Sequence, residues 1–282
     1  MIKLVITDLD DTLYSWIGFF IPAFYDMMQE LSLILDVPQN ELIKEYKTIH
    51  QEVGSVEYPF ATLKLPSVRK AYQGISDEQI SIELNSAFHK FNATRKKLLK
   101  LYPEVDDTLR FFRHNNIIIV AYTESAEENG FYRLKKLGID NFFKDVYVSD
   151  SLYKRPDTVL SSPKTHIVHG KKPNVDILKD ICSGEKIDMR EAVYIGDSLS
   201  KDMLMAKQAG VVSIWCDYPK DDIAELYSKL VAISHWNEQD FKQEEKYKNE
   251  WKVNNYSPDY TIHSFGECKG IIAKINGLTE EE

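Results

Sequence analysis

The chain has 282 residues, with 35 basic and 44 acidic side chains and therefore a formal net charge of −9. Its composition, 43% hydrophobic and 28% charged, is typical of a folded globular protein and excludes a disordered or fibrous one. The length allows one large domain or two ordinary ones, with a core that needs no disulfide or structural metal. The acidic balance disfavours nucleic acid and anionic membranes as partners, so we expect a small substrate.

The cysteines and the N-terminal segment indicate a cytoplasmic protein. Cys182, Cys216 and Cys268 are widely spaced and lack a C-x-x-C pair, which argues against a disulfide framework and against a zinc site. No signal-peptide pattern follows Met1. The apolar stretch over residues 16–25 falls short of the roughly 20 residues that span a bilayer.

In chain order, short apolar runs of strand length alternate with segments of helical spacing. The runs cover residues 3–7, 117–122, 146–149, 192–195, 211–215 and 260–262. One helical segment carries Phe131, Leu134 and Leu137, with Gly138 in the position of a helix C-cap. This alternation predicts an α/β fold, a Rossmann-like doubly wound parallel sheet whose ligands bind beyond the carboxyl ends of the strands.

Residues 16–101 break the alternation, because helical patterns prevail there over strand patterns. The helical spacing is clearest over residues 23–35, 40–53 and 77–91. We therefore predict an all-helical domain inserted after the first strand. The sheet domain is then discontinuous and comprises residues 1–15 and 102–282.

A second insertion is predicted at about residues 222–256, before the final strand. Its charged stretch over residues 238–252 is typical of a solvated surface helix. We expect this insertion to decorate the surface or to form an oligomer contact, and the sequence does not predict an oligomeric state.

Two acidic residues follow the first strand. Asp8 and Asp10 would project together from the carboxyl edge of the sheet, because side chains two apart on extended backbone face the same way. Like charges this close raise one pKa, which would leave one carboxylate as a nucleophile and the other as a proton carrier. A divalent cation would offset their repulsion. An acidic turn or a helix cap is the alternative interpretation.

Further polar residues follow later strands. Thr123 places a hydroxyl after the second long apolar run, and Lys172 offers a cation. Asp197 and Asp202 follow another strand, with Gly196 allowing a tight turn. Carboxylates completed by water are ligands that suit Mg²⁺. Each residue taken alone could have a purely structural role. A structural role does not explain why these residues follow one another at successive strand ends.

Together these motifs resemble the haloacid dehalogenase-like (HAD) superfamily of phosphohydrolases over nearly the whole chain. The family's four motifs are D-x-D-x-T after a strand, a hydroxyl after a strand, a lysine commonly followed by proline, and G-D-x-x-x-x-D. The matching residues, in that order, are Asp8, Asp10, Thr12, Thr123, Lys172, Pro173, Gly196, Asp197 and Asp202. The helical insertion resembles the family's C1-type cap.

The resemblance implies a Mg²⁺-dependent phosphatase that hydrolyses a small phosphorylated metabolite through an aspartyl-phosphate. Asp8 would be the nucleophile, and Asp10 would protonate the leaving alcohol and then deprotonate the attacking water. Thr123 and Lys172 would bind the transferring phosphate oxygens.

The resemblance also implies a set of magnesium ligands. The ion would be held by the Asp8 carboxylate, the Asp10 backbone carbonyl and Asp197. Asp202 would support the water shell of the metal or orient Lys172.

Two departures from the family pattern leave alternatives open. Glu124 follows Thr123 where the family often has Asn or a small polar residue, and it would point away from the substrate or pair with Lys172. Lys154 is a rival for the role of Lys172, because more residues than usual follow Ser149. Pro173 and the distance to the fourth motif favour Lys172.

Two other pairs of residues have two interpretations each. His166 and His169 have a spacing that could bind metal, although a surface turn is the simpler interpretation. Tyr14 and Trp16 are candidates for substrate neighbours or for packing beside the first motif.

Three other functions are alternatives to a phosphatase. A halogen-removing enzyme is disfavoured because that chemistry lacks the second acid, Asp10. A phosphomutase acting on a sugar phosphate would keep the same motifs. A catalytically silent binding or regulatory protein on this scaffold is disfavoured by the intact motifs.

Overall fold

The computed structural model describes residues 1–153, 164–218 and 223–278, and the chain divides into two compact units. The sheet unit comprises Met1–Ser15, Lys100–Pro219 and Gln243–Glu282. The helical unit comprises Trp16–Leu99 and Lys220–Lys242. This division groups residues 220–242 with the helical unit, whereas the sequence pattern assigns them to the sheet domain.

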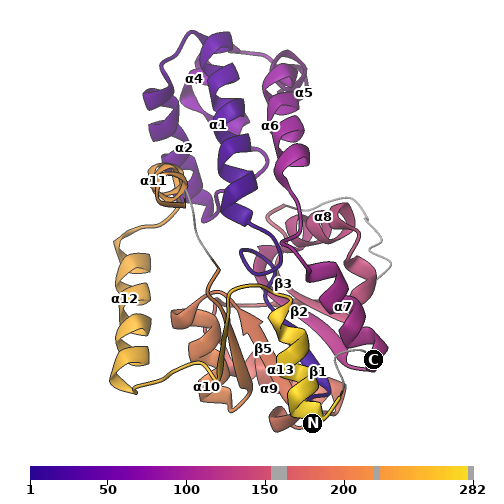
Figure 1. Cartoon of the computed structure of the whole chain (residues 1–282). Coiled ribbons are helices and arrows are strands. Elements are labelled where there is room, and N and C mark those ends of the chain that lie inside the picture. The colour runs from indigo at the N-terminus through magenta and orange to yellow at the C-terminus, as the bar shows by residue number, and fades with distance from the viewer. Residues whose placement is uncertain (154–163, 219–222, 279–282) are drawn as a thin grey trace. The chain divides into compact units, whose positions relative to one another are not determined.

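The strands of the described residues form one parallel sheet (Figure 1). They are β1 (Leu4–Thr7), β2 (Ile118–Ala126), β3 (Asp145–Ser149), β4 (Lys164–Val168), β5 (Ala192–Gly196), β6 (Val212–Cys216) and β7 (Tyr260–Ile262). Their order is β4-β3-β2-β1-β5-β6-β7, and every pair is parallel. The predicted α/β fold, with a parallel sheet and a helical insertion, is confirmed.

Alternate side chains of the central strands pack on opposite faces of the sheet. Ile6 and Tyr194 belong to one buried cluster with Leu178 of α9 (Val175–Glu185) and Met205 of α10 (Leu204–Ala209). Val5 is also fully buried, and the alternation directs it to the other face. There α7 (Val105–His114) contacts β2 and α13 (Glu267–Asn276). Burying both faces places the free strand ends, rather than the faces, within reach of a ligand.

Four further elements lie in the sheet unit. They are α8 (Glu127–Leu137), η1 (Asp140–Phe142), η2 (Met189–Glu191) and η3 (Leu199–Met203), of which η3 is a π-helical turn. The predicted C-cap of α8 is confirmed, because Gly138 has a φ of +72° and donates its N–H to carbonyls of the last helical turn. A left-handed residue at this position favours glycine.

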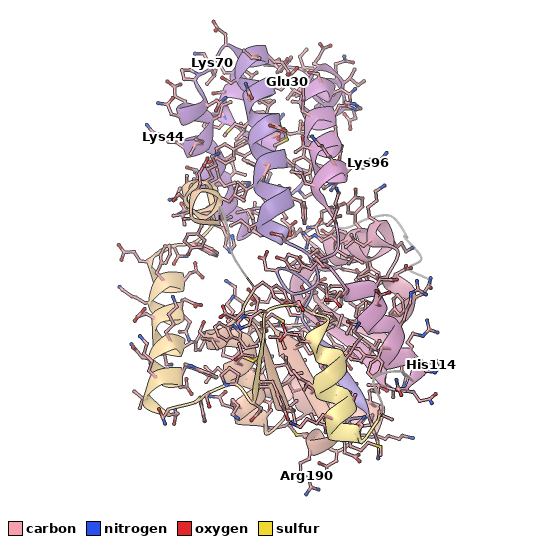
Figure 2. The ribbon with its side chains drawn as sticks, in the orientation of Figure 1. Glu30, Lys44, Lys70, Lys96, His114 and Arg190 are labelled. Atoms are coloured by element: carbon pink, nitrogen blue, oxygen red, sulfur yellow. The ribbon has the colours of Figure 1, made fainter. Side chains whose placement is uncertain are left out.

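The helices of the helical unit surround an aromatic core. They are α1 (Trp16–Leu35), α2 (Gln39–Val53), α3 (Ala61–Lys64), α4 (Pro66–Ala71), α5 (Asp77–Glu83), α6 (Asn85–Leu98) and α11 (Ile223–Ile233). Helix α1 packs on α6, and α11 packs on α1 and α2. Phe24 and Tyr46 meet edge to face with ring centroids 4.7 Å apart. The lysines Lys44, Lys70 and Lys96 lie at the surface of these helices (Figure 2).

Three local features differ from or add to the sequence pattern. Strand β4 was not predicted, and the helix expected over residues 77–91 is two helices, because Leu84 leaves helical geometry between α5 and α6. The charged helix is confirmed as α12 (Glu238–Val253), none of whose residues is fully buried.

In the described part of the chain, no helix combines the length and the apolar character needed to cross a membrane.

Candidate active site

Three of the predicted acidic residues meet at the carboxyl edge of the sheet. Asp8 follows β1, Asp197 follows the neighbouring β5, and Asp202 lies in η3. One carboxylate oxygen from each residue lies within 4.8 Å of the other two. Three hard oxygen ligands at this spacing suit a divalent cation, so the residues fit the magnesium that the sequence implies.

The electrostatics of Asp8 also fit a cation site. Burial raises the pKa of Asp8 well above its usual value, Lys172 lowers it, and Asp202 and Asp197 raise it again. A nucleophilic carboxylate must be ionised, and a cation beside it favours the ionised form. Lys172 directly contacts two of the three carboxylates, those of Asp8 and Asp202.

Lys172 is buried between two of these carboxylates. Its Nζ donates to Asp8 Oδ1 at 2.7 Å and to Asp202 Oδ1 at 2.9 Å. The ammonium also lies over the rings of Tyr122 and Tyr194, 4.9 and 5.5 Å from their centroids. Burial lowers the pKa of Lys172, but Asp202 and Asp8 outweigh it and raise the pKa well above its usual value. The lysine is therefore charged and fixed in place.

Asp202 is held by groups on three sides. Besides Lys172, it accepts hydrogen bonds from the Tyr194 hydroxyl at 3.0 Å and from the Ser198 N–H at 3.2 Å. Gly196 lies so close that a Cβ there would be 2.5 Å from Asp202 Oδ2. The glycine of the fourth motif is thus required by this close approach.

The second motif lies inside β2 rather than after it. Thr123 is buried, and its Oγ1 accepts the N–H of Ser125 at 3.1 Å, which leaves the hydroxyl hydrogen for a further acceptor. Glu124 accepts the backbone N–H of Lys172 at 3.1 Å and the Nζ of Lys201 at 2.7 Å. Burial raises the pKa of Glu124, but Lys201 and Lys172 outweigh it and hold the pKa below its usual value. Glu124 therefore pairs with Lys172, the lysine of the third motif, through the backbone N–H of that lysine.

The carboxylate of Asp10 has different partners from that of Asp8. Arg133 Nη1 lies 2.9 Å from Asp10 Oδ1 and 3.0 Å from Oδ2, and the Ser125 hydroxyl donates to Oδ2 at 2.5 Å. Arg133 Nη1 also donates to Ser125 Oγ at 2.6 Å. The two acids of the first motif are therefore held by two separate sets of donors.

Four residues around the site were not predicted from the sequence: Ser125, Arg133, Tyr194 and Lys201. Arg133 offered a usable indication, because it lies next to Leu134 on the buried face of α8 and three residues after buried Gly130. A basic residue within an apolar helix face requires an acidic partner. The other three gave no such indication.

Of the two histidines and the rival lysine, the structure describes only the histidines. His166 contacts Asp145 Oδ1 through Nε2 at 2.6 Å and stacks on Tyr147, and His169 is exposed. In the described residues neither histidine belongs to the group of acids spaced to hold a metal. Lys154 lies outside the described residues.

The two aromatic residues beside the first motif pack differently. Tyr14 is fully buried in the sheet unit, and its backbone pairs with Asp10 and Leu101. Trp16, in the helical unit, stacks on Phe20 with ring centroids 5.0 Å apart. The burial of Tyr14 favours the packing role over direct contact with a substrate.

Comparison with known proteins places these residues in a family. The family model described as haloacid dehalogenase-like hydrolase matches residues 2–210. A glyceraldehyde 3-phosphate phosphatase from Methanopyrus kandleri is 28% identical over 217 residues, covering 76% of this chain and 83% of that protein. A phosphoglycolate phosphatase from Pseudomonas putida is 25% identical over 142 residues, covering 50% and 46%.

Solved structures support the fold. The crystal structure of a 2-haloacid dehalogenase from Pseudomonas syringae matches with a TM-score of 0.58 at 21% identity, covering 98% of this chain and all of that chain. At this identity the likeness concerns the fold alone. The family model covers well over half of the chain and includes all four motifs. The chain therefore belongs to the haloacid dehalogenase-like hydrolases.

Proposed function

We propose that this protein is a Mg²⁺-dependent phosphatase that hydrolyses a small phosphorylated metabolite through an aspartyl-phosphate intermediate. The observation that carries the proposal is the buried Asp8 carboxylate, 2.7 Å from the Lys172 ammonium and beside two further carboxylates at a strand-end edge. The names of the relatives support a small phosphate ester as substrate. A cytoplasmic location is part of the proposal.

The acidic group would hold the metal. Asp8, the backbone carbonyl of Asp10 and Asp197 are the proposed ligands, and Asp202 orients Lys172 beside them. When bound, Mg²⁺ would supply positive charge against the repulsion between the Asp8 carboxylate and an anionic substrate.

The proposed reaction has two displacements at phosphorus. In the first, the Asp8 carboxylate attacks, an Asp8–phosphate bond forms and the bond to the leaving oxygen breaks, while Asp10 gives that oxygen a proton. In the second, Asp10 takes a proton from water, whose oxygen attacks the phosphorus and releases inorganic phosphate and the Asp8 carboxylate. Thr123 and Lys172 hold the phosphate oxygens in both steps.

The presence of Asp10 favours a phosphatase over a dehalogenase, although a dehalogenase is among the proteins with a similar fold. In dehalogenation the bond to the halide breaks without protonation of an alcohol, so no second acid is required. Here the second acid lies two residues after the proposed nucleophile and has its own donors.

The test is phosphate release from 4-nitrophenyl phosphate with Mg²⁺. We expect activity in the wild type, loss of it with a chelator, and a reduction of at least about 1,000-fold in Asp8→Asn, since an amide cannot form the intermediate. Acid-quenched wild type should carry one phosphoryl group by mass spectrometry, and Asp8→Asn should not. Full activity in Asp8→Asn would show that the nucleophile is another residue. A sugar phosphate interconverted without phosphate release would identify a mutase.

A further inference from the structure

Arg133, a buried arginine of α8, contacts Asp10, the proposed general acid. Arg133 Nη1 lies 2.9 and 3.0 Å from the two carboxylate oxygens of Asp10, and Ser125 donates to one of them at 2.5 Å. Arg133 also donates to Ser125 at 2.6 Å, so the three side chains form a closed triangle. The four named motifs assign no role to Arg133 or Ser125.

Burial differs sharply across this triangle. The Arg133 side chain is 3% exposed, whereas that of Asp10 is 23% exposed. An arginine is buried at this level only when its charge is compensated, and Asp10 provides the carboxylate. Arg133 is thus fixed by its surroundings, while Asp10 has one side open to a ligand.

Tyr14 lies beside the triangle. It is fully buried, and its backbone pairs with that of Asp10.

We propose that Arg133, together with Ser125, is a positioning residue that fixes the orientation of the Asp10 carboxylate for proton transfer to the leaving group; this inference rests on the proposed function. A proton donor contributes only when it is held within hydrogen-bond reach of the leaving oxygen. The side chain of Asp10 has two rotatable bonds. The hydrogen bonds from Arg133 and Ser125 to its carboxylate restrict rotation about both.

The ratio of activities with two different leaving groups distinguishes a positioning role from a purely structural one, because a purely structural role would not change this ratio. Phenyl phosphate and 4-nitrophenyl phosphate have leaving groups of similar shape, but phenolate is the more basic and depends more on protonation. General acid catalysis contributes about 100-fold to 10,000-fold where it is needed. A loss of Asp10 orientation should therefore affect phenyl phosphate more than 4-nitrophenyl phosphate.

The experiment compares kcat/KM of Arg133→Ala with both substrates at saturating Mg²⁺. We expect a reduction of about 100-fold with phenyl phosphate and of less than about 10-fold with 4-nitrophenyl phosphate. Ser125→Ala should shift the ratio in the same direction by a smaller factor, and Arg133→Lys should restore part of it. Lys136→Ala, an exposed position on the same helix, is the matched control and should leave the ratio unchanged.

A double variant tests whether Arg133 acts through Asp10. In the Asp10→Asn background, Arg133→Ala should cause no further loss with 4-nitrophenyl phosphate. Equal losses with both substrates in the single variant, or independent losses in the double variant, would overturn the inference. If Arg133→Ala does not fold, Ser125→Ala and Arg133→Lys decide the question. A wild type inactive on both substrates would instead contradict the proposed function.

Discussion

Two buried polar regions, the carboxyl edge of the sheet and the core of the helical unit, are stabilised in opposite ways. At the sheet edge, Lys172 keeps its charge because Asp8 and Asp202 compensate it. In the helical unit, His50 is buried against the carbonyl of Ile233 at 2.7 Å, and its Nε2 has no partner in the described residues. One region buries compensated charges, and the other keeps its titratable group neutral. Function is therefore expected to depend on the first region, whereas both regions contribute to folding stability.

The largest effect is expected from Lys172→Ala. This change leaves the buried Asp8 and Asp202 carboxylates without their shared cation, and breaking a buried pair costs about 3–5 kcal/mol. We expect the free energy of unfolding to fall by that amount and turnover of 4-nitrophenyl phosphate to fall by at least about 100-fold, because the proposed donor to the phosphate is lost.

Lys154→Ala is the comparison for this experiment, because Lys154 is the rival by sequence. It should affect turnover far less than Lys172→Ala. The opposite result would assign the phosphate-binding role to Lys154, and the sheet edge would then be a structural ion pair only.

A smaller effect, confined to the helical unit, is expected from pH. Burial lowers the pKa of His50 from 6.5 to about 4. The unfolded chain therefore binds the proton more tightly than the folded chain, so stability present at neutral pH is lost as pH falls from about 6.5 toward 4. The expected loss over this window is about 3 kcal/mol, at 1.36 kcal/mol per unit of pKa difference.

Urea unfolding of wild type and His50→Gln at several pH values measures this contribution. The glutamine side chain at this position cannot titrate. The difference between the two curves of stability against pH therefore isolates His50 from the carboxylates that both proteins share. Parallel curves would show that His50 is not buried in its neutral form.

The smallest effect is expected from Tyr194→Phe, which removes one donor to Asp202 at the sheet edge. A hydrogen bond to a charged group contributes about 1.5–3 kcal/mol, and Asp202 keeps its other donors, so we expect the lower end of this range. Tyr122→Phe is a matched control, because the Tyr122 hydroxyl is buried without a hydrogen-bond partner in the described residues. Equal destabilisation by the two changes would remove Tyr194 from the network around Lys172.

The strand-end residues were predictable from sequence because parallel strands bring their carboxyl ends to one edge. Asp8 and Asp197 each follow an apolar run on neighbouring strands, so their proximity follows from topology alone. Their catalytic roles stay predictions, since geometry shows proximity and not reaction.

Other features could not be predicted, for local physical reasons. Among the described residues, strand β4 lies at the sheet edge and pairs only with β3, so its sequence needs no continuous apolar run, and Lys164 and His166 are tolerated there. The partner of Arg133 is 123 positions away in sequence, and only the packing of α8 against β2 identifies it. Pairing at such a distance leaves no periodic pattern in a single chain.

The bond from Glu124 to Lys201 has an evolutionary consequence. A neutral residue at position 124 would leave the ammonium of Lys201 without its carboxylate, close to a loop that already holds the cation of Lys172. The two positions are therefore expected to covary: lineages that retain the acid at 124 should retain a base at 201, and lineages with a small polar residue at 124 should lose that base. The unusual glutamate of the second motif would then mark a subgroup by a pair of residues rather than by one.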